Sequence, residues 1–333
     1  MTLDTIMSVG VEGSVRDGGV TPHVEAEVLE VAVPLTTVWS SPDAPREVDL
    51  PALLDTPDLA AWVHRMDAAL RKGLNGRTLT QLLLGEPVHV LEEAEDWVRV
   101  AAAWQPSSAH PSGYPGWVRR AHLAPPAGPG AARAVVTSPR TTLTLDAGRR
   151  HEVSFGTSLA VAEGAVETPD VHVWVPDRHK SPHIGTLRRC DVHLTASDAG
   201  TAAAGADLLR TAALFLGLGY LWGGTSSWGL DCSGLVHLVL RSHGVVVPRD
   251  ARDQAQAILP LELAEAGAGD LFFFARPGEP AHHVGFVSPD GDGRTPRMLH
   301  APEGGGLVET TALATHRTDT VVTAGRVLGG ATG

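Results

Sequence analysis

The sequence has few of the features that usually indicate an oxidising compartment, a nucleic-acid partner or a membrane. It contains only two cysteines, Cys190 and Cys232, which are too few for a disulfide framework. It contains no block of Lys and Arg, and a formal net charge of −12 argues against a nucleic-acid partner. It also lacks any window approaching the roughly 20 apolar residues that span a bilayer. We therefore expect neither nucleic acid nor a membrane among its partners.

The first ten residues likewise lack the features of a secretory signal. They contain Asp4 but no Lys or Arg, and they form no apolar stretch. The sequence therefore predicts a cytoplasmic protein. A hydrophobic content of 43% and a charged content of 19% are ordinary for a globular chain, and 333 residues favour two or three domains over one.

Residues 1–125 indicate an arm followed by a small β-barrel. Residues 1–30 show no sustained period and are predicted to form an extended or poorly ordered arm. Residues 31–125 contain short strand-like segments separated by turns, which is typical of such barrels. Within them, apolar residues recur at helical spacing over about residues 50–74, which predicts a helical insertion. The strand-like segments are Val31–Trp39, Val88–Leu91, Trp97–Val100 and Gly116–Val118.

Residues 133–195 repeat this pattern after a Pro-, Gly- and Ala-rich linker at residues 124–132. Three segments match segments of the first barrel in order: Gly156–Val161 matches Gly85–Val90, Val171–Val175 matches the strand at Trp97, and Gly185–Arg189 matches Gly116–Arg120. The sequence therefore predicts a second, more divergent barrel.

Residues 201–328 have a different pattern. The segment Ala202–Leu216 is rich in Ala and Leu at helical spacing, and another helix is expected after Asp231. Beyond Gly267 the pattern changes to short strands, and helices followed by an antiparallel sheet make an α+β domain. The expected strands are Asp270–Phe274, His283–Val287, Met298–His300, Leu307–Glu309 and Thr320–Arg326.

The segment Asp231–Gly234, with the sequence Asp-Cys-Ser-Gly, stands at the start of the second helix. Asp231 is a good N-cap, the apolar run Leu235–Leu240 continues the helix, and Gly244 can end it. Cys232 then lies in the first turn, where unpaired N–H groups and the helix dipole favour a thiolate. Its pKa is expected to fall far enough for attack on carbonyls at neutral pH. A lone cysteine is more often a small buried hydrophobe, but this setting favours a nucleophile.

Two histidines are candidate partners for this sulfur. His283 and His300 lie on predicted strands that flank a turn at Pro289–Arg294, so a hairpin would make them near cross-strand neighbours. One imidazole would take the thiol proton and the other would orient it. Asp290 and Asp292 are alternatives for the orienting role, but as turn residues they would lie too far from His283.

The sequence resembles the NlpC-type (NlpC/p60) family of cell-wall cysteine peptidases over residues 201–328. The resemblance implies a papain-like α+β catalytic domain with Cys232, His283 and His300 as catalytic residues, and it leaves His282 without a role. The preceding barrels resemble bacterial SH3-like modules. No metal and no cofactor are implied, since a helix-start cysteine with two partners lacks the usual zinc ligand set. The matching segments, in the family's order, are Tyr220–Gly224, Asp231–Gly234, Val247–Arg249 with Gln254, Gly269–Phe274, His283–Gly285 and His300–Pro302.

Two SH3-like modules before the catalytic domain resemble the YkfC-like γ-D-glutamyl-L-diamino acid endopeptidases. In that branch, the equivalents of Asp231 and Ser233 hold the free amine and the D-Glu carboxylate of the substrate. The first module supplies an acid and a tyrosine, which Glu86 and Tyr114 match. Tyr220 is implied to orient the substrate or, with the backbone N–H of Cys232, to stabilise the oxyanion. The plainer alternatives are helix capping for the first two residues, a solvated acid for Glu86 and aromatic packing for the tyrosines.

One segment departs from the family pattern. Some relatives place a substrate-contacting serine after the Pro-Arg pair that ends at Arg249, and this chain has none. Asp250 or Arg252 could take its place, or the pocket could differ. Cys190 is expected to be a buried or incidental thiol.

These features predict a cysteine endopeptidase that cleaves the γ-D-glutamyl–diamino acid bond of peptidoglycan stem peptides with a free N-terminal L-Ala, in wall turnover or recycling. Two alternatives stay open. The first is a non-catalytic wall-peptide binding protein, which a lack of thiol reactivity toward iodoacetamide at neutral pH would favour. The second is an amidase or acyltransferase on the same core, which release of free acyl groups would favour.

Overall fold

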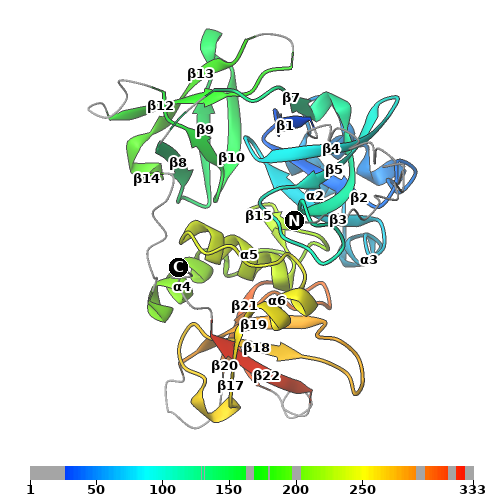
Figure 1. Ribbon diagram of the computed structural model, residues 1–333, viewed down its shortest axis with the longest axis vertical. Coiled ribbons are helices and arrows are strands. Elements are labelled where there is room, and N and C mark those ends of the chain that lie inside the picture. Colours follow the sequence, from blue (N-terminus) through cyan, green and yellow to red (C-terminus); the bar gives the residue numbers. More distant parts are fainter. Residues whose placement is uncertain are drawn as a thin grey trace, which may run out of the picture.

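The computed structural model describes residues 27–128, 130, 132–162, 169–178, 181–196, 204–289, 297–313 and 320–326. Two β modules lie side by side in the upper part of Figure 1, and an α+β domain lies below them. This arrangement agrees with the fold class expected from the sequence. Within the described ranges, no helix is both long enough and apolar enough to cross a bilayer.

The first β module is one antiparallel sheet with the strand order β3-β2-β6-β5-β4-β1-β7. The expected hairpin is confirmed, since β4 and β5 pair from Val88 opposite Ala102 to Ala94 opposite Trp97. The sheet begins within the expected arm, because β1 pairs with both β4 and β7. Residues 1–26 of that arm lie outside the described residues. The strands are β1 (Val28–Val31), β2 (Leu35–Trp39), β3 (Thr78–Leu83), β4 (Pro87–Ala94), β5 (Trp97–Ala102), β6 (Tyr114–Arg119) and β7 (Leu123–Ala124).

The helical insertion between β2 and β3 consists of several short helices. Asp58 and Asp67 interrupt the helical period, because each caps a new helix by accepting a hydrogen bond from a backbone N–H three residues on. The buried Trp62 ties the insertion together by donating its Nε1–H to Asp49 Oδ1 at 2.8 Å. The helices are η1 (Glu47–Asp49), α1 (Leu50–Leu53), α2 (Leu59–His64) and α3 (Ala68–Lys72).

The second β module contains a sheet of order β10-β9-β13-β12 and a sheet of order β11-β8-β14. Its likeness to the first module extends to backbone conformation, because Gly85 and Gly156 have φ angles of 79° and 80°, which favour glycine. Both modules also leave their penultimate strand through a 3-10 turn, η2 (Arg120–His122) in the first and η4 (Arg189–Asp191) in the second. Its other elements are β8 (Ala132–Val136), β9 (Arg140–Thr144), η3 (Asp146–Gly148), β10 (Arg150–Ser154), β11 (Ser158–Ala160), β12 (Asp170–Val175), β13 (His183–Arg188) and β14 (Val192–Ala196).

The third domain packs helices on an antiparallel sheet of order β17-β22-β18-β19-β20-β21. Four of the five strands expected after Gly267 form, whereas the strand expected at Leu307–Glu309 lies further on, at Glu309–Ala312. The edge strand β17 and the helix α6 were not expected. The domain boundaries expected from the sequence stay predictions. The elements are α4 (Gly205–Ala212), η5 (Ala213–Phe215), β15 (Thr225–Ser226), β16 (Gly229–Leu230), α5 (Cys232–Ser242), α6 (Ala251–Ala257), β17 (Leu259–Leu261), η6 (Leu263–Glu265), β18 (Leu271–Phe274), β19 (His283–Ser288), β20 (Arg297–His300), β21 (Glu309–Ala312) and β22 (Val321–Arg326).

Helix α5 occupies the centre of the molecule, between the sheet of the third domain and the two β modules (Figure 1). Every residue from Cys232 to Leu240 is buried, including the polar Ser233 and His237. One hydrophobic cluster runs from Trp39 of the first module through α5 to Phe286 of the sheet. Gly244, with a φ of 77°, follows the end of the helix as expected. The core therefore fixes the position of the helix start, where the candidate site lies.

Candidate active site

Cys232 is the first residue of α5, and a tight backbone arrangement holds it there. Asp231 caps the helix, with Oδ1 accepting from Gly234 N at 2.6 Å and Oδ2 accepting from Gly223 N at 2.9 Å. A Cβ atom at position 234 would lie 2.0 Å from the carbonyl oxygen of Gly224. Glycine at 234 therefore lets the glycine-rich segment before the helix pack directly on its first turn.

The two histidines come together as near cross-strand neighbours, as expected. Phe286 of β19 lies opposite Leu299 of β20, so His300 comes beside Gly285 rather than opposite His283. A Cβ on Gly285 would lie 2.8 Å from the Cβ of His300, so glycine gives the imidazole its space. His283 Nε2 and His300 Nδ1 are 2.9 Å apart, and both side chains are buried. Residues 290–296, including Asp290 and Asp292, lie outside the described residues.

The contacts of His300 indicate where the protons of this pair lie. Its Nε2 is 3.6 Å from Glu309 Oε1, and a carboxylate oxygen can only accept from it. At 3.6 Å this is an electrostatic contact and not a hydrogen bond, and it favours a proton on His300 Nε2, with Nδ1 accepting from His283 Nε2–H. His283 Nδ1 is then the nitrogen that carries a lone pair.

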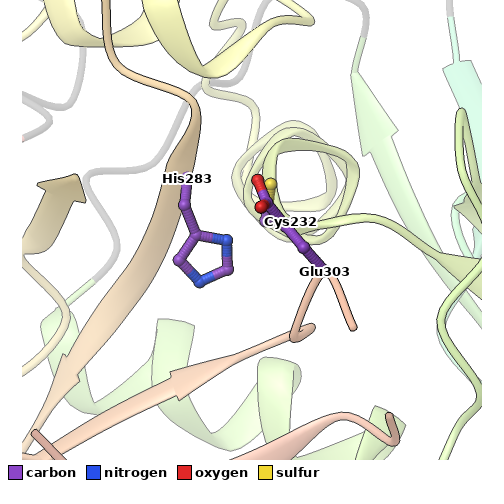
Figure 2. A group of neighbouring side chains, drawn as sticks. All are labelled: Cys232, His283 and Glu303. Atoms are coloured by element: carbon purple, nitrogen blue, oxygen red, sulfur yellow. The ribbon is translucent and has the colours of Figure 1, made fainter. Parts of the chain in front are cut away.

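That nitrogen faces the sulfur. Figure 2 shows the imidazole of His283 turned towards Cys232, with the carboxylate of Glu303 beside the sulfur. The sulfur, a ring nitrogen of His283 and a carboxylate oxygen of Glu303 all lie within 4.8 Å of one another. The Cys232 thiol donates to the carbonyl oxygen of His282 at 3.9 Å, so His282 meets the site through its backbone. An exposed loop acid such as Glu303 gave no signal in the sequence.

The thiol does not have the lowered pKa expected at a helix start. Burial raises the pKa of Cys232 above its usual range, and the negative charges of Asp231 and Glu303 raise it further. Desolvation and these carboxylates outweigh the helix dipole, so that expectation is not borne out. A raised pKa favours the protonated thiol, so a base must take its proton during any attack.

Arg249, which was expected only as part of a family motif, is a central residue of the site. Its side chain is 1% exposed, and its guanidinium binds both oxygens of Asp231, at 3.0 and 2.6 Å. It also donates to Ser233 Oγ at 3.0 Å and to Thr80 Oγ1 of the first module at 2.8 Å. Asp231 and Ser233, expected to bind substrate, are thus already engaged by a buried cation. The sequence signal for this buried role was the position of the arginine directly after an apolar segment.

A groove of about 570 Å³ runs between the first module and the third domain, with Cys232 in its lining. That volume is in the range of small-molecule and peptide pockets. The groove is lined by Asn75, Gly76, Thr78, Leu79, Tyr114, Tyr220, Trp222, Asp231, Cys232, Ser233, Asp250, Ala251, Arg252, Arg276, Ala281, His282 and Glu303. The structure therefore brings seven of the eight predicted site residues together or into contact with one another, the exception being Glu86.

Tyr114 and Asp250 meet across this groove. The Tyr114 hydroxyl donates to the two carboxylate oxygens of Asp250 at 3.1 and 3.0 Å. Burial raises the pKa of Asp250, and the charges of Asp231 and Asp253 add to the rise while Arg249 opposes it. Burial likewise raises the pKa of Tyr114, so its phenol stays a hydrogen-bond donor. Asp250 thus stands in the segment where a serine was expected.

Tyr220 lines the groove beside the nucleophile, as expected. Burial raises its pKa, the negative charge of Asp231 adds to the rise, and a thiolate at Cys232 would raise it further. Its hydroxyl therefore also remains protonated.

Glu86 is the site residue that the sequence placed wrongly. It is 2% exposed, and its Oε1 lies 2.6 Å from Arg241 Nη1. Arg241 lies in the last turn of α5, roughly 14 Å along the helix axis from Cys232. Glu86 therefore balances a buried charge at the far end of α5 and does not line the groove. Cys190, which was expected to be a buried or incidental thiol, is an exposed free thiol.

Comparison with known proteins extends over most of the chain. Residues 217–326 match the model of the NlpC/P60 family, and residues 70–123 match that of the bacterial dipeptidyl-peptidase Sh3 domain. A gamma-D-glutamyl-L-lysine dipeptidyl-peptidase of Bacillus cereus is 33% identical over 304 residues, which cover 86% of this chain and 86% of the relative. A protein of the same name from Bacillus subtilis is 35% identical over 285 residues, which cover 84% and 91%. A crystal structure of an NlpC/P60 family protein from Bacillus cereus matches with a TM-score of 0.84 at 30% identity, over 91% of this chain and 100% of that chain.

Proposed function

Because the chain belongs to the NlpC/P60 family of cysteine peptidases, we propose that it hydrolyses the γ-D-glutamyl–diamino acid bond of peptidoglycan stem peptides that carry a free N-terminal L-Ala. The observation that carries the proposal is a sulfur, an imidazole and an orienting imidazole that meet at the edge of a groove. The two relatives named for gamma-D-glutamyl-L-lysine cleavage support the choice of bond.

In the proposed mechanism, Cys232 and His283 act together rather than as a preformed ion pair. His283 Nδ1 takes the thiol proton as the sulfur attacks the γ-carbonyl carbon of D-Glu. His300 accepts from His283 Nε2–H and keeps the lone pair on Nδ1. The protonated imidazole then gives its proton to the leaving amine of the diamino acid as the C–N bond breaks. A water molecule, deprotonated by His283, hydrolyses the thioester.

Two donors are available for the negative oxygen of the tetrahedral intermediate. The backbone N–H of Cys232 is one, because the first residue of a helix has no intrahelical acceptor. The hydroxyl of Tyr220 is the other, because its raised pKa keeps it protonated beside the sulfur. We assign both to the oxyanion.

Asp250 and Tyr114 are the proposed site for the L-Ala ammonium. Asp231 has both oxygens occupied by Arg249, so we assign Asp231 and Ser233 to holding the start of α5. Asp250 faces the groove, and an ammonium would offset the cost of its buried charge. Such a requirement would confine the enzyme to peptides already released at L-Ala, as in wall turnover or recycling. The cytoplasmic location expected from the sequence stays a prediction.

The direct test compares L-Ala-γ-D-Glu-diamino acid peptides with and without N-acetylation. The free peptide should be cleaved to the L-Ala-γ-D-Glu dipeptide and the diamino acid, and the acetylated peptide should be cleaved far more slowly. Cys232→Ala should keep the thermal unfolding midpoint of the wild type and lose turnover. Turnover that survives this substitution would remove the nucleophile assignment, and equal cleavage of both peptides would remove the amine requirement.

A further inference from the structure

We propose that Glu303 binds the leaving amine of the diamino acid, and that the same site lets a free amino acid take the acyl group back from Cys232. The enzyme then transfers L-Ala-γ-D-Glu to an amine as well as to water. This inference rests on the proposed peptidase function and adds a second acceptor for the thioester.

The carboxylate of Glu303 lies beside the position that the scissile nitrogen takes. One of its oxygens, the sulfur of Cys232 and a ring nitrogen of His283 all lie within 4.8 Å of one another (Figure 2). Three atoms so placed have a common point no more than about 2.8 Å from each, which is within hydrogen-bond distance. The scissile nitrogen comes to this region because it is bonded to the carbon that the sulfur attacks and takes its proton from His283. No movement of the chain is needed for Glu303 to reach it.

The charges of the groove fit this assignment. Its lining contains three acids, Asp231, Asp250 and Glu303. Both oxygens of Asp231 are bound by Arg249, and Asp250 is the proposed site for the L-Ala ammonium. Burial, Asp231 and Glu303 together raise the pKa of the Cys232 thiol, so a cation beside Glu303 removes part of the repulsion that a thiolate meets. The two substrate nitrogens that carry or gain a positive charge thus have one acid each.

In hydrolysis, Glu303 binds the amine as it leaves. The C–N bond breaks as His283 gives one proton to the nitrogen. The neutral amine takes a second proton from solvent and becomes an ammonium, which the carboxylate binds in a charge-assisted hydrogen bond.

Transfer uses the same positions in the opposite direction. A free amino acid binds with its α-ammonium on Glu303 and loses one proton to solvent. Its nitrogen attacks the thioester carbonyl carbon, and a second proton passes to His283 Nδ1. The C–S bond breaks as His283 returns that proton to the sulfur of Cys232. The product is a new γ-D-glutamyl amide, and no other reactant is needed.

The test measures how the acyl-enzyme divides between water and an amine. Cleavage of L-Ala-γ-D-Glu-L-Lys with isotopically labelled free L-lysine present should give labelled tripeptide as well as dipeptide, in a ratio of initial rates that rises with lysine concentration. Glu303→Gln should lower this ratio about tenfold, the lower end for a hydrogen bond to a charged group, because Glu303 is exposed. Both products form from one acyl-enzyme, so slower acylation in a variant does not change the ratio.

Two controls separate the ammonium from general effects. Hydroxylamine is uncharged at neutral pH, so its ratio of transfer to hydrolysis should be the same in wild type and in Glu303→Gln. Glu279→Gln removes another exposed acid, which pairs with Arg276 of the groove lining, and it should keep the wild-type ratio for lysine.

Three results would overturn the proposal. Hydrolysis without labelled tripeptide would show that no amine reaches the thioester. An unchanged lysine ratio in Glu303→Gln, or an equal fall with hydroxylamine, would show that Glu303 does not bind the ammonium. A peptide that is not cleaved at all would instead refute the proposed peptidase function, so the two failures are distinguishable.

Discussion

Asp250→Asn is the most direct test of the proposed binding of the substrate's free amine. The substitution keeps the size and shape of the side chain and removes its charge. Losing one partner of a hydrogen-bonded charge pair costs about 2–5 kcal/mol when the pair is buried. Asp250 is only half-buried, so about 2–3 kcal/mol is the expected loss, which corresponds to roughly 30- to 160-fold in kcat/KM.

The assay is a cycle of two enzymes and two peptides. Wild type and Asp250→Asn are each measured on free and N-acetylated L-Ala-γ-D-Glu-diamino acid peptide. Wild type should prefer the free peptide by the factor given above, and the variant should lose most of that preference. Tyr114→Phe is the matched control, because it keeps the carboxylate and removes one hydrogen bond worth about 1 kcal/mol. It should lower kcat/KM several-fold and keep the preference for the free amine.

The reasoning fails if Asp250→Asn discriminates between the two peptides as strongly as wild type does. The ammonium would then be bound elsewhere in the groove. A uniform fall of kcat/KM on both peptides would also count against the assignment, because it would indicate a general disturbance around Tyr114 rather than loss of a specific charge pair.

Three further predictions follow from buried groups. Because the pKa of Cys232 is raised, alkylation of the Cys190→Ser protein by iodoacetamide should be slow at pH 7 and still rising at pH 9 by mass spectrometry. A plateau below pH 7 would contradict this, and slow alkylation alone does not indicate a non-catalytic protein. Burial lowers the pKa of His122 to about 4, so its contribution to stability is complete above about pH 6.5 and is lost as pH falls towards 4. Relative to His122→Gln, wild type should lose about 2 kcal/mol between pH 7.5 and pH 5 in urea unfolding. Glu86→Gln should lower the free energy of unfolding by about 3 kcal/mol by isolating Arg241, and it should leave KM unchanged. A raised KM for the free-amine peptide would instead indicate that Glu86 takes part in substrate binding.

The sequence predicted the parts of the site that local structure determines. Asp231 as N-cap, Cys232 in the first turn and Gly244 after the helix end all follow from short-range hydrogen bonding and backbone preference. The hairpin of His283 and His300 also follows from short-range signals. In the observed pairing, Phe286 lies opposite Leu299, and glycine at 285 leaves space for the close approach of His300.

Contacts between distant segments were beyond that reasoning. The bond from Arg249 to Thr80 joins residues 169 positions apart in the chain, and no local pattern indicates it. Glu86 was misplaced for the same reason, because a match to a short motif does not tell which end of α5 the loop meets. Glu303 is an exposed acid in a turn, and only the folded chain brings it to the sulfur.

Arg249 makes the groove a joint product of two domains. A buried guanidinium is tolerable only when its donors are satisfied, and those of Arg249 bind Asp231 and Ser233 at the helix start and Thr80 on β3 of the first module. Any shift of the module against α5 would break one of these bonds and leave a charged donor buried without a partner. The wall that carries Tyr114 is therefore held at a fixed position relative to Cys232. The relative position of the two domains therefore fixes the distance between the site for the substrate's amine and the site of bond cleavage. The catalytic domain alone does not fix that distance.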